Sequence, residues 1–386
     1  MKQCYYFSAP GRTEIGGNQV DHQNGCVLAG SVNLQTVAEV CRNDSGVIRV
    51  DSAGFAPVKI ALDDLSVHEA EQNTTAALVR GVAAAFQQRG CQLQGFDARV
   101  RSDVLPGSGL SSSAAFEVLM ASICNTLFCD SRLSAVEIAR IGQWAENVYF
   151  GKPCGLLDQM ACAVGGMVFI DFADPAAPVV ERVDFDFSKS GHALCIIDVG
   201  ADHADMGQEY AAVPGELRAL SALFGKSVLR EIPEEEFFAR LPQIRHKVPD
   251  RAILRAIHFY QENRRVLGEV AALRQNDFDA FLRLVRQSGQ SSWMYIQNVI
   301  PAGAVAHQEM AVALALCDTL LQGRGAYRVH GGGFAGTVQA FVPDELLPSF
   351  RAELERMLGS GCCHVLQILP TGAGALREAP QTAAFL

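Results

Sequence analysis

The sequence has no long apolar run and no excess of positive charge. No stretch of its 386 residues approaches the roughly 20 apolar residues that span a bilayer. The opening MKQCYYFSAP has no apolar run long enough for a secretory signal. Lysine and arginine number 32 against 42 aspartates and glutamates, a formal net charge of -10. The composition therefore predicts a cytoplasmic protein that binds neither nucleic acid nor a membrane.

Paired cysteine motifs are also absent. The 12 cysteines are spread along the chain without a Cys-x-x-Cys pair. Cys362, Cys363 and His364 are adjacent, but nothing in the sequence completes a zinc site with them. We therefore expect reduced, mostly buried thiols and no metal bound by cysteine.

The length and the order of the elements predict two domains. A composition of 49% hydrophobic and 19% charged residues is typical of a globular protein, and a chain this long usually divides. A boundary near 185 to 190 gives domains at 1–188 and 189–386. Short strands are expected at 25–34, 45–52 and 95–105, and helices at 73–90, 111–128 and 133–151. Strands with helices added in blocks indicate an α+β protein.

A run of serines bracketed by glycine is the strongest chemical signal. In VLPGSGLSSSAAFEVL, residues 104–119, a strand-like run ends, two glycines follow, and a helix begins within the serines. A helix start offers free N–H groups and partial positive charge, which suits phosphate. The loop lacks the lysine of a P-loop, and Ser112 stands where a dinucleotide fingerprint needs its third glycine. The expected phosphate contacts are Gly107, Ser108, Gly109, Leu110, Ser111, Ser112 and Ser113; an ordinary serine-capped helix is the alternative.

A second glycine cluster, HGGGFAGT at 330–337, could suggest the oxyanion loop of an esterase. The Gly-x-Ser-x-Gly elbow that such an enzyme needs is absent. The cluster instead indicates a loop that passes close to a nucleotide or to another loop.

Taken together and in order, five pieces of the sequence resemble galactokinases of the GHMP kinase superfamily. They are the Pro-Gly-Arg stretch within 8–30, PGSGLSSSAA, WAENVYFGKPCGLLDQM, a tyrosine after a strand at Tyr210, and YRVHGGGFAGTVQAFV. The resemblance implies two domains, the first like the second domain of ribosomal protein S5 and the second ferredoxin-like, with the active site between them. It also implies phosphoryl transfer from MgATP to the anomeric hydroxyl of galactose.

The resemblance implies a role for each matching residue. Asp158 would take the proton of the sugar hydroxyl, and Arg12 would pair with it and keep the carboxylate ionised. A purely structural ion pair is the alternative. The serine loop, residues 107–113, would hold the phosphates of ATP. Ser113 and Glu146 would contact Mg²⁺. For Glu146, which lies twelve residues before Asp158, the alternative is an exposed helix acid.

The sugar contacts are implied in the same way. Asp21 would accept hydrogen bonds from ring hydroxyls, since a carboxylate can hold two of them. Gly155 would let the backbone approach the sugar closely. Tyr210 would add a hydroxyl or a ring face, unless it only packs on an amphipathic helix.

One part of the sugar motif departs from the family. Where galactokinases usually carry Gly-Glu-His-Thr-Asp-Tyr, this chain reads Gly-Asn-Gln-Val-Asp-His from Gly17 to His22. We expect Asn18 and Gln19 to contact the far end of the sugar, where an amide tolerates CH₂OH and would also accept a uronic acid. A different galactose-like substrate, such as galacturonate or N-acetylgalactosamine, is therefore an alternative. A sensor that binds sugar and ATP without turnover is another, although the retained Arg12 and Asp158 argue against it. We expect a monomer whose partners are the sugar and ATP.

Overall fold

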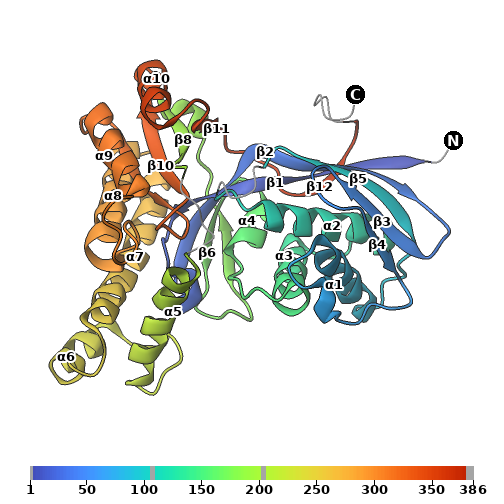
Figure 1. Ribbon diagram of the computed structural model, residues 1–386, viewed down its shortest axis with the longest axis horizontal. Coiled ribbons are helices and arrows are strands. Elements are labelled where there is room, and N and C mark those ends of the chain that lie inside the picture. Colours follow the sequence, from blue (N-terminus) through green and yellow to red (C-terminus); the bar gives the residue numbers. More distant parts are fainter. Residues whose placement is uncertain (1–2, 105–108, 201–205, 380–386) are drawn as a thin grey trace.

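The computed structural model describes residues 3–104, 109–200 and 206–379. A large, curved sheet with helices α1–α4 on one face forms the first lobe (Figure 1). Helices α5–α10 and a smaller sheet form the second lobe at the other end of the molecule. The α+β prediction is confirmed.

The strands are β1 Cys4–Gly16, β2 Cys26–Arg42, β3 Val47–Ser52, β4 Val58–Ala61, β5 Phe96–Ser102, β6 Met167–Asp171, β7 Val179–Arg182, β8 His192–Asp198, β9 Ala326–His330, β10 Thr337–Pro343, β11 Cys363–Leu366 and β12 Gly374–Leu376. The helices are α1 Thr75–Gln88, α2 Ser112–Phe128, α3 Ala135–Trp144, α4 Leu157–Val164, α5 Gly207–Ala222, α6 Glu234–Ile244, α7 Asp250–Arg274, α8 Phe278–Ser291, α9 Glu309–Leu321 and α10 Leu347–Leu358. Of these described helices, none is both long and apolar enough to cross a membrane.

The large sheet is built around β1 and β2, which pair antiparallel over most of their length. Within the described residues its main order is β12-β1-β2-β5-β3-β4, and β6 and β7 extend it from β2. Helix α2 is apolar on nearly every side, as expected of a helix enclosed by its neighbours. It packs beneath β1 and β2 (Figure 1).

The small sheet has the order β11-β8-β10-β9 and is antiparallel throughout. Helices α8, α9 and α10 pack on its strands, and residues such as Ile197, Leu314 and Val338 form a second hydrophobic core there. Helix α7 also contacts β1 and β2 of the first lobe. It therefore connects the two lobes.

The chain returns to the first lobe near its end. After β11 it crosses back, and β12 pairs with β1 through Tyr6 and Leu376. If the domains divide between residues 188 and 189, at least one segment of the second domain, β12, packs on the first. The division itself stays a prediction.

The expectation of reduced thiols is wrong for four cysteines. Cys4 lies directly opposite Cys41 in the β1–β2 ladder, and the two form a disulfide. Cys91, beyond α1, is bonded to Cys129 at the end of α2. The pairing depends on strand register and helix packing, which cysteine spacing does not reveal. The other eight are free, and all but Cys154 are buried.

Candidate active site

Three segments far apart in the sequence meet at the carboxylate of Asp158. Arg12 on β1 donates from Nε to its Oδ1 at 2.7 Å, and the Ser111 hydroxyl donates to its Oδ2. Arg12 also donates from Nη1 to the carbonyl oxygen of Gly109. The arginine is 8% exposed, whereas the Asp158 side chain is 38% exposed, so the carboxylate stays open to a substrate while its partner is buried. The structure thus joins β1, the start of α2 and the start of α4 at one point.

The electrostatics of Asp158 favour the ionised form. Burial alone would raise the pKa of its carboxyl group, but the charge and hydrogen bond of Arg12, together with the bond from Ser111, outweigh burial and lower the pKa. Asp158 therefore carries its negative charge at neutral pH.

The serine loop is described from Gly109 onward, and Gly107 and Ser108 lie outside the described residues. The side chain of Leu110 is fully buried, and its carbonyl oxygen accepts the N–H of Arg12 at 3.0 Å. Ser111 has a positive φ of 59° and turns its hydroxyl to Asp158. The Ser111 hydroxyl is thus engaged with the carboxylate, and the expected contact of Ser111 with phosphate stays a prediction.

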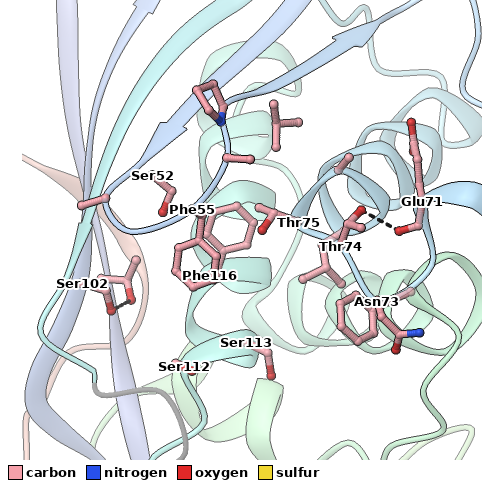
Figure 2. Close-up of a pocket in the computed structure, with 18 of the residues that line it drawn as sticks. Ser52, Phe55, Glu71, Asn73, Thr74, Thr75, Ser102, Ser112, Ser113 and Phe116 are labelled. Carbon is pink, nitrogen blue, oxygen red and sulfur yellow. Dashed lines mark hydrogen bonds between the residues drawn. The ribbon is translucent and has the colours of Figure 1, made fainter.

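Ser112 and Ser113 begin α2 and line a cavity of about 800 Å³. Figure 2 shows Phe55 and Phe116 turned into this cavity, with the two serines below them. Its remaining polar lining includes Ser52, Lys59, Asn73, Thr74, Thr75 and Ser102. Sequence reasoning missed this cavity. Phe55 lies in the turn between β3 and β4 and is 56% exposed. The sequence shows a phenylalanine beside Gly54 but does not reveal that its ring is exposed.

Glu146 lies in a single π-helical turn, Ala145–Phe150, that follows α3. It is 3% exposed, which rules out the exposed helix acid. Its Oε2 accepts from Gln159 Nε2 at 2.9 Å, and Lys152 lies 3.4 Å from its Oε1. The same Gln159 nitrogen donates to Glu117 on α2 at 3.0 Å. Sequence reasoning missed Glu117, whose pKa is raised well above the usual range by burial and then by the charge of Glu146.

Asp21 and Gly155 lie against each other. A Cβ atom at Gly155 would stand 2.2 Å from Oδ2 of Asp21, so a larger residue would displace this carboxylate from its position. Burial and then repulsion from Asp158 raise the pKa of Asp21.

The glycine cluster 330–337 contacts the sugar candidates Gln19 and Tyr210. Gln19 donates from Nε2 to the carbonyl oxygen of Gly332 at 3.0 Å. The Tyr210 hydroxyl donates to the carbonyl oxygen of Gly333 at 3.0 Å, and its ring lies 2.6 Å from where a Gly332 Cβ would stand. The glycines therefore permit a close approach between loops, as the sequence indicated.

Asn18 does not occupy the expected position, and this corrects the sequence prediction. Its side chain is fully buried, and Nδ2 donates to Glu14 Oε1 at 3.0 Å and to the carbonyl oxygen of Gly331 at 2.6 Å. Its Oδ1 accepts from Asn298 Nδ2 at 2.9 Å. Both amide hydrogens and the amide oxygen are thus bonded within the protein, so Asn18 holds the loop and has no donor left for a sugar.

His330 is a further residue that the sequence did not single out. Its Nε2 accepts the backbone N–H of Glu14 at 3.2 Å, and its Nδ1 therefore donates to Thr337 Oγ1 at 2.9 Å. A Cβ at Gly109, which has a φ of 68°, would stand 2.7 Å from Thr337 Oγ1 and 3.2 Å from His330 Nδ1. Burial lowers the pKa of His330 well below its usual range. A neutral histidine thus supports the start of the serine loop.

Comparison with known proteins places the chain in a family. Residues 2–42 match the family model described as galactokinase galactose-binding signature, and residues 77–166 match the GHMP kinases N terminal domain. A galactokinase of Streptomyces coelicolor is 32% identical over 341 residues, which cover 87% of this chain and 84% of the relative. The chain belongs to the galactokinase family. A galactokinase of Glaesserella parasuis is 30% identical over 344 residues, covering 89% and 86%.

Solved structures agree with this kinase family in fold. A galactokinase of Lactococcus lactis, solved in complex with galactose, matches with a TM-score of 0.80 at 23% identity and covers 97% of this chain and 95% of that one. A mevalonate kinase matches with a TM-score of 0.67 at 12% identity over 94% and 99%. The GHMP kinase fold implied by the sequence motifs is confirmed, and the chain is a phosphotransferase that uses ATP and an alcohol acceptor.

Proposed function

We propose that this galactokinase family member transfers the γ-phosphate of ATP to the anomeric hydroxyl of galactose. The observation that carries the proposal is the ion pair of Arg12 and Asp158 beside the first residues of α2. Phosphoryl transfer needs alignment and charge neutralisation more than covalent help. The Asp158 carboxylate can align the acceptor hydroxyl, and the Arg12 guanidinium and the helix start can neutralise negative charge.

Asp158 takes the proton of the anomeric hydroxyl, and Arg12 lowers the pKa of Asp158 and so its strength as a base. Because the transition state of phosphoryl transfer is loose, the sugar oxygen releases its proton late. A carboxylate with a lowered pKa is a weak base, which suffices for a proton that leaves late. The Arg12 guanidinium also stabilises negative charge on the attacking oxygen. Ser111 holds the carboxylate in one orientation.

The cavity in Figure 2 receives the nucleoside part of ATP. Phe55 and Phe116 offer ring faces to a purine base, while Ser52 and Asn73 offer hydrogen bonds to its edge. The phosphates extend toward Ser112 and Ser113, where the unpaired N–H groups of α2 favour negative charge. Gly107 to Gly109 precede these contacts in the chain.

Ser113 and Glu146 would hold Mg²⁺. Among the described residues no group of three histidine, cysteine or acidic side chains could hold a metal, and Mg²⁺ with a nucleotide needs only one or two carboxylates beside phosphate oxygens. The buried Oε1 of Glu117 has no hydrogen-bond partner and lies next to Glu146, so a cation relieves the excess negative charge there. Mg²⁺ would neutralise charge on the transferred phosphate.

Asp21, Gln19 and Tyr210 bind the sugar, with Gly155 making room for Asp21. Galacturonate is the second candidate substrate, because Asn18 and Gln19 replace the acid and the histidine that galactokinases usually carry at these positions. N-acetylgalactosamine is a further acceptor to compare. We also propose that the protein is a cytoplasmic monomer with domains at 1–188 and 189–386, of which the second returns β12 to pair with β1.

The test is ADP release with MgATP and a panel of galactose, galacturonate, N-acetylgalactosamine and glucose. ADP with galactose supports the proposal, and ADP with galacturonate alone selects the second candidate. Sugar binding without ADP from any member would mean a sensor.

A further inference from the structure

The connection between β1 and β2, residues 17–25, carries Gln19 and Asp21 and belongs to the first lobe. Helix α7 of the second lobe lies against this connection and bonds to both of its ends. We call residues 17–25 the sugar loop. A loop this long needs an outside support if its side chains are to hold one geometry.

Glu262 of α7 holds the beginning of the sugar loop. Its Oε1 accepts the backbone N–H groups of Gly17 at 3.3 Å and of Asn18 at 3.2 Å, and the Ser288 hydroxyl at 2.6 Å. Its Oε2 accepts from Arg265 Nε at 2.7 Å. The glutamate is fully buried. Burial would raise its pKa, but the charge of Arg265 and the hydrogen bond from Ser288 contribute to lowering the pKa to about 2. Glu262 is therefore a carboxylate at neutral pH.

His258, one helical turn earlier on α7, bonds to the backbone carbonyl group of Asn18. Its Nε2 lies 2.8 Å from the carbonyl oxygen of Asn18, which can only accept, so Nε2 carries the proton and donates. Its Nδ1 then accepts from the Ser291 hydroxyl at 2.8 Å. At the other end of the loop, Asn263 Oδ1 accepts the N–H of Cys26 at 2.6 Å.

We propose that Glu262 and His258 are positioning residues of the sugar site, through which the second lobe sets the geometry of Gln19 and Asp21. They bond only to the backbone of Gly17 and Asn18 within the loop, and neither is expected to contact the sugar. The inference rests on the proposed function and extends it. Because small displacements of a binding group weaken productive binding strongly, loosening this support affects the sugar before it affects ATP.

The central variant is Glu262→Gln. The amide keeps the size of the carboxylate, but its NH₂ must face either Arg265 Nε–H or the N–H groups of the loop, so one donor meets another. We expect the KM for galactose to rise about tenfold, the loss of one charge-assisted hydrogen bond. The KM for ATP should not change, and kcat should fall by less than about threefold on the same argument.

His258 supplies an independent pair of variants. In His258→Gln, the amide nitrogen can still donate near the position of Nε2, whereas His258→Ala removes the donor. We expect His258→Ala to raise the KM for galactose and His258→Gln to restore most of it. The matched control is Glu234→Gln, whose carboxylate pairs with Arg264 at the surface and does not contact the loop. This control should behave as the unaltered protein.

Hydrogen–deuterium exchange of residues 16–25 tests the support without any sugar. Exchange at Gly17 and Asn18 should accelerate in Glu262→Gln and not in Glu234→Gln. If the unaltered protein releases no ADP with any sugar, the proposed function is wrong. The exchange measurement still shows whether Glu262 stabilises the sugar loop. Unchanged exchange and an unchanged sugar KM in folded Glu262→Gln would overturn the inference.

Discussion

The position of single residues in the site is determined by the atoms that contact them. Asp158 receives Arg12 and Ser111 on its two oxygens, so its orientation and charge are both determined. Gly155 has no side chain because Asp21 occupies that space. Two predictions belong at this scale.

Asp158→Asn should abolish turnover while galactose still binds. The amide cannot take a proton, and a positioned base commonly supplies on the order of 10² to 10⁴ in rate. ADP release measures the loss, and calorimetry with galactose measures retained binding. Asp186→Asn, at an exposed acid of a surface pair, is the control. Normal turnover in Asp158→Asn would remove the role given to this residue.

Gly155→Ala should weaken the sugar without weakening ATP. The new methyl group would push Asp21 from its position, so we expect the KM for galactose to rise by about tenfold or more, as one charged hydrogen bond is lost. Gly215→Ala is the matched control, since its Cβ meets nothing within 4 Å. Equal effects of the two variants on the sugar KM would contradict the placement of Asp21.

Whole elements bring the chemistry together through their ends. The start of α2 faces the end region of β1, the start of α4 supplies Asp158, and the turn between β3 and β4 supplies Phe55. Strand and helix interiors provide rigidity, and their ends provide accessible groups. The β3–β4 turn is the element whose role is tested most directly.

Phe55→Ala should raise the KM for ATP and leave the protein as stable as before. The ring is more than half exposed in the free protein, so its loss creates no cavity in the core. Stacking of a base on an aromatic side chain is worth about 1–3 kcal/mol, so we expect at least a fivefold rise. Val67→Ala removes a comparably exposed side chain away from the cavity. An unchanged KM for ATP in Phe55→Ala would show that the adenine does not stack on Phe55.

At the scale of the molecule, the sequence predicted what its motifs and periodicities specify locally. The helices expected at 73–90 and 111–128 are α1 Thr75–Gln88 and α2 Ser112–Phe128, because apolar spacing and the serine start act within one element. Arg12 and Asp158 meet as the family motif implied. Their catalytic roles stay predictions.

What depends on contacts between elements was not predicted. Asn18 was assigned to the sugar, but its partners Glu14, Gly331 and Asn298 come from three separate segments. The return of β12 and the two disulfides likewise depend on packing. A partial signal for the support of the sugar loop was present: His258, Glu262, Arg265 and Glu269 recur at spacings of four, three and four on α7. Such a polar stripe in a long helix indicates one buried face with ionic partners.

Glu269, the last member of that stripe, gives a prediction for the stability of the whole molecule. It is fully buried between α7 and Gly16, and neither carboxylate oxygen has a hydrogen-bond partner. Burial and then the charge of Glu262 raise its pKa well above the usual 4.5. The folded state therefore retains a proton that the unfolded state releases above about pH 4.5, so stability falls as pH rises from there toward the folded pKa.

Glu269→Gln removes this linkage because the amide is neutral in both states. We expect a melting temperature higher than that of the unaltered protein by on the order of 2 °C at pH 7.5, and a difference that shrinks as the pH falls to about 4.5. Melting curves of both proteins between pH 4.5 and 8 measure it, with Glu353→Gln, a surface acid paired with Arg356, as the control. A lower melting temperature for Glu269→Gln at pH 7.5 would mean that the carboxylate is ionised and paired in the folded protein, and that the contact between α7 and β1 is held by charge instead of by a buried neutral acid.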